Sequence, residues 1–230
     1  MTHHTRDGDQ AKDLVQQHWN GRASMFDSES QHGIHSEEQH DRWLTVLRES
    51  VGTDPCQVLD VGCGTGVVSL LLGELGHDVV GVDFAPAMLD RARTKAHRGD
   101  HSIGFHRGDA ETLAVPDDAV ELVTARHLIW TLPNPHDALH EWKRVVEPGG
   151  RILLIEGYWD HSEPWDEYEE VHDDLPMYDG RPPAELAEVL RQRGFTDVTH
   201  ESLVDATLWG REPRHDYYLM TGTVPRDGTH

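Results

Sequence analysis

The sequence predicts an α/β fold in which helices cover both faces of a doubly wound, mostly parallel β-sheet. Two observations lead to this prediction. Short apolar runs typical of strands alternate with helical segments from residue 57 onward, and such alternation is typical of a parallel sheet. A glycine-rich turn at Gly62–Gly66 follows the first of these runs and precedes a helix. Ligands of such sheets bind at the carboxyl ends of the strands.

The size and charge of the chain limit its partners. Its 230 residues fit one large domain better than two. The formal net charge is −22, so neither a nucleic acid nor an anionic membrane is an expected partner. Lysine occurs only at Lys12, Lys95 and Lys143. This acidic, lysine-poor composition resembles that of halophilic proteins, whose carboxylates are screened by salt; an ordinary acidic protein accounts for it equally well.

The location of the protein is expected to be cytoplasmic. No apolar run approaches the roughly 20 residues that a membrane span needs, and the N-terminus lacks the apolar segment of a signal peptide. Cys56 and Cys63 are the only cysteines. One falls in a predicted strand and the other in the glycine turn, so we expect no disulfide between them.

Each element of the fold follows from the spacing of apolar residues. Helices are predicted at 13–30 and 37–50, ahead of the sheet. Strands are predicted at 57–61, 78–82, 103–107, 120–125, 151–156, 195–202 and 216–223. The helices between them are predicted at 67–75, 86–97, 136–146 and 183–193. Pro148-Gly149-Gly150 is typical of a helix stop. Residues 158–180 are acidic and aromatic without a clear period, and we interpret them as an insertion.

The segment Asp60–Gly66 has the properties of a nucleoside-binding turn. Glycines allow positive φ and a close approach of a ligand to the backbone, and the helix that follows offers free N–H groups. The next strand ends at Asp83, whose carboxylate can accept hydrogen bonds from a ribose diol. A dinucleotide site is the alternative. Its fingerprint needs a small residue at position 67, where this chain has Val67, and the G-x-G-x-G spacing disfavours NAD.

Four segments together resemble the class I S-adenosylmethionine (SAM)-dependent methyltransferase family, in its small-molecule, type 11 branch. They are Asp60–Gly66, Asp83, Gly108-Asp109-Ala110 and Glu147–Arg151. The resemblance implies a Rossmann-like, seven-stranded sheet in the order 3-2-1-4-5-7-6 with strand 7 antiparallel, in a single domain with an N-terminal helical cap. It also implies transfer of a methyl group from SAM to a small-molecule acceptor by in-line displacement, which leaves S-adenosylhomocysteine (SAH).

The resemblance also implies a division of the chain and a set of cofactor contacts. Residues 1–50 would form the cap, and 51–230 the SAM-binding domain with a substrate lid at 158–180. In the leading helix Arg22 would meet the SAM carboxylate, while Trp19 and Phe26 would shield the sulfonium. The remaining candidates for cofactor binding are Asp60, Gly62, Cys63, Gly64, Gly66, Asp83, Phe84, Met88, Asp109, Ala110 and Arg126.

Candidate catalytic and substrate residues follow the fourth strand and the fifth. His127 is the candidate base or acceptor-orienting group, because its ordinary pKa lies near neutrality; a hydrogen-bonded structural histidine is the alternative. The candidate substrate residues are Trp130, Tyr158, Trp159 and His35. His136 and His140 would share a helix face, but no third ligand lies near them in sequence, so no metal is expected.

The sequence leaves the acceptor open. A quinone-type C-methyltransferase is one alternative, and a non-catalytic SAM-binding protein is another. An NAD-dependent oxidoreductase is a third. The expected partner is a small-molecule substrate, and the chain is expected to be a monomer or a homodimer.

Overall fold

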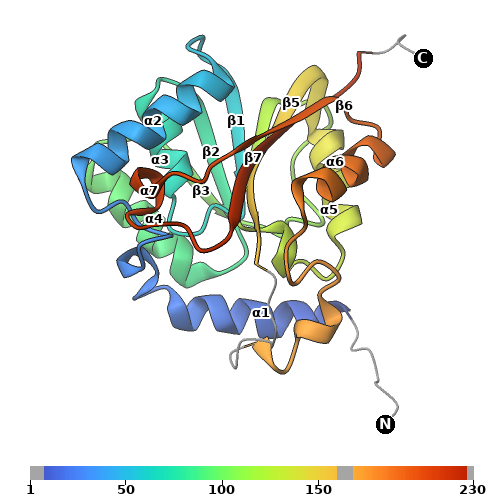
Figure 1. Ribbon diagram of the computed structural model, residues 1–230, viewed down its shortest axis with the longest axis horizontal. Coiled ribbons are helices and arrows are strands. Elements are labelled where there is room, and N and C mark those ends of the chain that lie inside the picture. Colours follow the sequence, from blue (N-terminus) through green and yellow to red (C-terminus); the bar gives the residue numbers. More distant parts are fainter. Residues whose placement is uncertain (1–7, 160–167, 227–230) are drawn as a thin grey trace.

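The computed structural model describes residues 8–159 and 168–226, and the sheet predicted from the sequence is confirmed. Seven strands lie in the order β3-β2-β1-β4-β5-β7-β6 (Figure 1). Strands β1 to β5 are parallel, and β7 pairs antiparallel with β5 and β6. The strands are β1 Gln57–Val61, β2 Asp78–Asp83, β3 Gly104–Arg107, β4 Val120–Arg126, β5 Val146–Tyr158, β6 Thr196–Ser202 and β7 Asp216–Thr223.

Helices cover both faces of the sheet. They are α1 Gly8–Arg22, α2 Glu37–Val51, α3 Val67–Glu74, α4 Pro86–Arg98, α5 Pro135–Val145, α6 Pro183–Gln192 and α7 Ala206–Trp209, with short 3₁₀ turns η1 Phe26–Ser28, η2 Ile129–Thr131 and η4 His172–Asp174. The side chains of β5 alternate between the two cores. Leu153 and Ile155 pack with α2 and α3, whereas Ile152 and Leu154 pack with α5 and α6. This two-sided burial explains the uninterrupted apolar run Ile152–Ile155 within β5.

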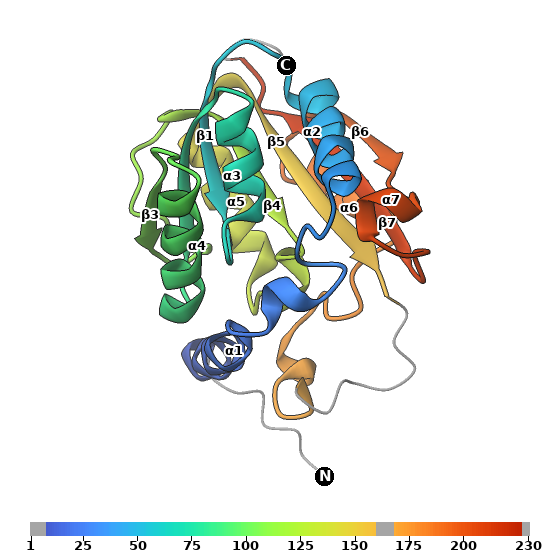
Figure 2. The ribbon, with the colours of Figure 1, turned by 90° about the vertical axis from the view of Figure 1, so that its left-hand side faces the viewer.

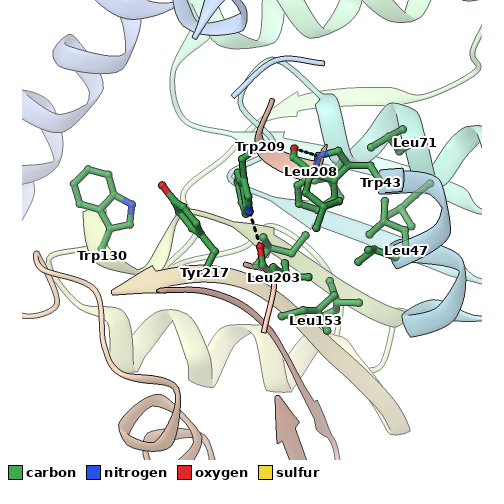
Figure 3. Packing of buried hydrophobic residues seen from close by; sticks show 14 of the residues in the cluster. Trp43, Leu47, Leu71, Trp130, Leu153, Leu203, Leu208, Trp209 and Tyr217 are labelled. Carbon is green, nitrogen blue, oxygen red and sulfur yellow. Dashed lines mark hydrogen bonds between the residues drawn. The ribbon is translucent and has the colours of Figure 1, made fainter. Parts of the chain in front are cut away.

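The short helix α7 is fixed against α2 by two tryptophans. The indole N–H of Trp43 donates to the carbonyl of Leu208 at 2.8 Å, and that of Trp209 donates to the carbonyl of Leu203 at 2.7 Å (Figure 3). Both side chains are only 1% exposed. The sequence analysis missed α7, because four residues are too few for a helical period to be recognised.

Helix α1 lies across the end of the sheet at which the parallel strands finish (Figures 1 and 2). The amide of Gln16 donates to the carbonyl of Phe84 at 2.8 Å, and Asn20 Oδ1 accepts from the N–H of Ala87 at 3.0 Å. The predicted helix at 13–30 was wrong at both ends, since α1 begins at Gly8 and ends at Arg22. The serines and Asp27 beyond it form turns, which their side chains favour over helix.

The boundary before β5 was also predicted incorrectly. Helix α5 ends at Val145, and β5 begins at Val146 without an intervening loop. The Pro-Gly-Gly segment lies inside the strand, where Gly149 adopts a φ of +93°. Its N–H donates to the carbonyl of Val224 at 2.8 Å. Hydrogen bonds to Val224, the residue after β7, thus replace the turn that the local sequence favours. Among the described residues, no helix is long and apolar enough to cross a membrane.

Candidate cofactor and active site

The glycine turn after β1 has the backbone that the sequence predicted. Gly62, Gly64 and Gly66 all have positive φ values, of 64°, 54° and 81°, which only glycine adopts without strain. A Cβ on Gly62 would lie 2.6 Å from Leu128, whereas one on Gly64 would meet only Phe26, at 3.8 Å. The turn is therefore closed behind Gly62, whereas a methyl group on Gly64 would reach no more than ordinary contact with the ring of Phe26.

Two buried carboxylates flank this turn. Asp83 at the end of β2 accepts the N–H of Gly64 and the N–H of Ala85, both at 2.8 Å, and burial raises its pKa to about 6. Each of its oxygens keeps a second lone pair for a ligand hydroxyl. Asp60 is 1% exposed, accepts from the hydroxyl of Ser69 and has a pKa raised to about 7 by burial.

These groups open onto a cavity of about 110 Å³. It collects most of the predicted cofactor, catalytic and substrate residues, namely Trp19, Phe26, Asp60, Gly62, Cys63, Gly64, Asp83, Phe84, Met88, Asp109, Ala110, Arg126, His127 and Trp130. It is also lined by residues that the sequence analysis did not select, among them Lys12, His32, Thr65, Glu111 and Leu128. Sequence spacing could not select them, because they come from α1 and from loops that fold over the sheet.

The predicted adenine end of the cavity is closed by a lysine. The ammonium of Lys12 in α1 lies 2.7 Å from Asp109 and 2.6 Å from Glu111. These two carboxylates raise the pKa of Lys12 against the opposing effect of its burial. Asp109 also accepts the N–H of Glu111 at 2.9 Å. Helix α1 is therefore joined to the loop that was predicted to hold the adenine.

A second link joins the N-terminal segment to the glycine turn. Asp27 accepts the hydroxyl of Thr65 at 2.6 Å and the ammonium of Lys95 at 3.0 Å. Lys95 also donates to Thr65 at 3.0 Å. These three side chains fix the segment that carries Phe26 above the turn.

Arg126 is a buried cation at the end of β4. Its guanidinium lies 4.9 Å from the ring centroid of Trp43 and 5.4 Å from that of Trp209, and it donates to the carbonyls of Gln31 and His32. Burial lowers its pKa to about 10. Within the described part of the chain, its Nε atom is buried without a hydrogen-bond partner.

His127 follows in a strained conformation. Its φ is +54°. Residues other than glycine rarely adopt this region, and those that do are often found at functional sites. Its N–H donates to the carbonyl of Ile155 at 2.8 Å. Its Nδ1 is buried and finds no partner among residues 8–159 and 168–226. Burial, together with Arg126 and His32, holds its pKa well below the usual range, so the ring is neutral at pH 7.

Comparisons with known proteins agree with this arrangement. The family described as a methyltransferase domain matches residues 59–154. The demethylmenaquinone methyltransferase of Deinococcus radiodurans is 40% identical over 110 residues, which are 47% of this chain and 46% of that protein. These matches support a class I SAM-dependent methyltransferase, with residues 59–154 as its methyltransferase domain. The chain spans about half the length of the first two curated relatives.

Solved structures share the fold of this chain at low sequence identity. The [4+2]-cyclase SpnF has a TM-score of 0.72 and 20% identity, over 92% of this chain and 96% of that one. Phosphoethanolamine N-methyltransferase 2 of Haemonchus contortus, in complex with SAM, has a TM-score of 0.64 and 17% identity, over 81% of this chain and 53% of that one.

The residues that line the cavity fit SAM. Gly64 lines the cavity, so a ligand there can approach its backbone, and Asp83 retains lone pairs for a diol. The Nε of Arg126 is buried and has no hydrogen-bond acceptor among the described residues. The carboxylate of SAM could serve as that acceptor, because carboxylates pair well with guanidinium groups. Among the described residues, no group of three or more His, Cys, Asp or Glu side chains is arranged to hold a metal ion.

Five of the predicted site residues do not line the cavity. Arg22 pairs with Glu29, and the ring of His35 lies 3.2 Å from the carbonyl of Glu29. Gly66 packs against Phe105 and Ala92. Tyr158 bridges to Gly180, and Trp159 packs behind His127, with 5.8 Å between ring centroids. Of the predicted lid at 158–180, residues 160–167 lie outside the described chain.

Proposed function

We propose that the protein transfers the methyl group of SAM to a small-molecule acceptor. The observation that carries this proposal is a single cavity that joins a positive-φ glycine turn, the diol-binding carboxylate of Asp83 and the buried guanidinium of Arg126. Bound there, SAM would supply a methyl group already activated on a sulfonium. The protein then has to align the acceptor with that methyl group, and alignment alone lowers a barrier by about 7–11 kcal/mol.

Different side chains of the cavity would bind the parts of SAM and align the acceptor. Asp83 would hold the ribose, with Phe84 and Met88 beside the adenine. Phe26 and Trp19 line the cavity beside the glycine turn, and their edge-to-face contact, with 5.8 Å between ring centroids, fixes both rings. Aromatic faces stabilise a sulfonium as they do other cations, and they exclude water from the reacting centre.

The acceptor end of the cavity favours a planar, weakly polar molecule. Its lining there comes from His32, His127, Leu128 and Trp130. The carboxylates of the cavity are engaged at the cofactor end, for example Asp109 and Glu111 with Lys12. The named activity of the Deinococcus relative makes a quinol the second candidate acceptor. A non-catalytic SAM-binding protein remains the alternative function.

Calorimetry tests the cofactor assignment. SAH should bind the wild-type chain, and Asp83→Asn should weaken binding by roughly 10–100-fold through lost charge-assisted hydrogen bonds. Asp78→Asn is the matched control, since Asp78 lies on the same strand but is exposed. Binding of NADH in place of SAH, or an unchanged affinity in Asp83→Asn, would contradict the proposal.

Methyl transfer is tested separately with SAM labelled on its methyl group. The wild-type chain is incubated with a panel of phenols, catechols, 1,4-naphthohydroquinone and primary amines, and label in the organic product is counted. Transfer to any member supports an enzyme. Tight SAM binding without transfer to any of them supports the non-catalytic alternative.

A further inference from the structure

Two histidines line the cavity, and their surroundings differ. His32 comes from the segment between α1 and α2, and His127 from the end of β4. Their ring centroids are 6.3 Å apart, with the planes at 84°. The Nε2 of His32 lies 3.4 Å from a carboxylate oxygen of Glu29, whereas the Nδ1 of His127 has no hydrogen-bond partner in the described chain. Only His32 therefore has an acid that can stabilise a gained proton.

Glu29 is fixed by other side chains. Arg22 pairs with its Oε1, and the amide of Gln31 donates to its Oε2 at 3.2 Å. The interaction with His32 and the charge of Arg22 hold the pKa of Glu29 below its usual value, against the effect of burial. Glu29 is therefore a carboxylate at pH 7. A carboxylate beside one imidazole nitrogen sets the tautomer and stabilises the imidazolium.

The ring of His32 is placed over the glycine turn. It stacks on Phe26 with 4.1 Å between centroids and 18° between planes, and Phe26 lies 3.8 Å from the position of a Cβ on Gly64. The guanidinium of Arg126 lies 3.5 Å from the carbonyl of His32, to which it donates. Stacking on one side and a backbone hydrogen bond on the other hold the imidazole at the cavity wall.

We propose that His32 is the general base of the reaction, with Glu29 as its positioning residue. This inference rests on the proposed function. The bond between the nucleophilic atom of the acceptor and its proton breaks, and the electron pair stays on that atom. The proton goes to Nδ1 of His32, because Nε2 faces Glu29, and it later leaves to solvent. The acceptor would then be a molecule that arrives protonated, such as a phenol or a hydroquinone.

The charges around His32 agree with this role. Glu29 acts on it from its own segment, Arg22 from the end of α1, and Arg126 and His127 from the end of β4. Burial lowers the pKa of His32 below its usual value, while Glu29 opposes that change. At pH 7 the ring is neutral and able to accept a proton, which a general base requires.

Titration of the histidine rings by NMR, on the SAH-saturated chain, tests the pair without turnover. The resonance of His32 is assigned by its loss in His32→Gln. Glu29→Gln should lower its midpoint by about one pH unit, because the stabilising charge is removed. His40 and Glu74, 2.9 Å apart and partly exposed on α2 and α3, give the control: Glu74→Gln should leave His32 unmoved. An unchanged midpoint in Glu29→Gln would overturn the inference.

Kinetics with the best acceptor of the panel test the catalytic role. His32→Gln should lower kcat by roughly 10²–10⁴-fold and remove the acidic limb of the pH profile, while the affinity for SAH changes less than threefold. His40→Gln should retain full kcat. Full kcat in His32→Gln overturns the base assignment alone. Absence of SAH binding in the wild type overturns the proposed function instead, and binding without transfer to any acceptor overturns the base together with the enzyme.

Discussion

Glu156 is expected to make the stability of this protein depend on pH. It lies on β5, is 1% exposed, and accepts the N–H groups of Leu128 and Ile129 through one oxygen, both at 3.0 Å. Its other oxygen is buried and has no partner in the described residues. Burial raises its pKa from 4.5 to about 8. The protonated side chain of Glu156 thus holds the turn after His127 through these two hydrogen bonds.

The magnitude follows from proton linkage. Between pH 4.5 and 8 the folded chain keeps a proton on Glu156 that the unfolded chain has released. The free energy of unfolding then falls by about 1.4 kcal/mol per pH unit, or about 5 kcal/mol over the interval. This stabilisation is complete below pH 4.5 and lost as the pH rises through 8. Glu156→Gln keeps the accepting oxygen but cannot ionise, so it should not show this loss.

The assay is urea unfolding followed by tryptophan fluorescence at pH 5, 6, 7, 8 and 9. The quantity of interest is the difference in unfolding free energy between Glu156→Gln and the wild type, in which the titrations of other groups cancel. It should rise with pH up to 8 and then level off. Glu147→Gln, exposed on the same strand, should follow the wild type. The reasoning would be refuted if the difference in unfolding free energy between Glu156→Gln and the wild type changed by less than about 1 kcal/mol from pH 5 to 9.

Three further predictions concern the cofactor half of the site. Because the pKa of Asp83 is raised to about 6 by burial, calorimetry should show the affinity for SAH falling as the pH drops through 6, by up to about tenfold per unit, and this fall should be absent in Asp83→Asn. Gly62→Ala places a methyl group 2.6 Å from a leucine at a φ of +64° and should cost roughly 2–4 kcal/mol in urea unfolding, whereas Gly76→Ala, at +94° with open space around it, should cost only about 1–2 kcal/mol. Lys12→Met removes the ion pair to Asp109, so hydrogen exchange should speed up in α1 and remain unchanged in β1.

The sheet and the cofactor edge were predictable because their signals are local. Strand β1 has apolar residues at Val58, Leu59 and Val61, and the glycine turn after it needs backbone angles that the residue types themselves reveal. The strand order came from the family resemblance, and the structure confirms it. Helix α7 and the early start of β5 escaped prediction because partners distant in sequence decide them, as with the pairing of Gly149 and Val224.

The acceptor side was harder to predict for the same physical reason. The sequence analysis selected His35 from the loop after α1, yet the cavity is lined by His32. Nothing in the spacing of the two histidines distinguishes them. The difference arises because Phe26 stacks on one ring, while the carbonyl of Glu29 lies beside the other. A loop side chain gains its role from the surface that it packs against, so residues that contact the acceptor must be read from tertiary contacts. By the same argument, related enzymes with different acceptors should differ in the loop after α1 and in the turn after β4. They should share the Asp60–Gly66 turn and Asp83.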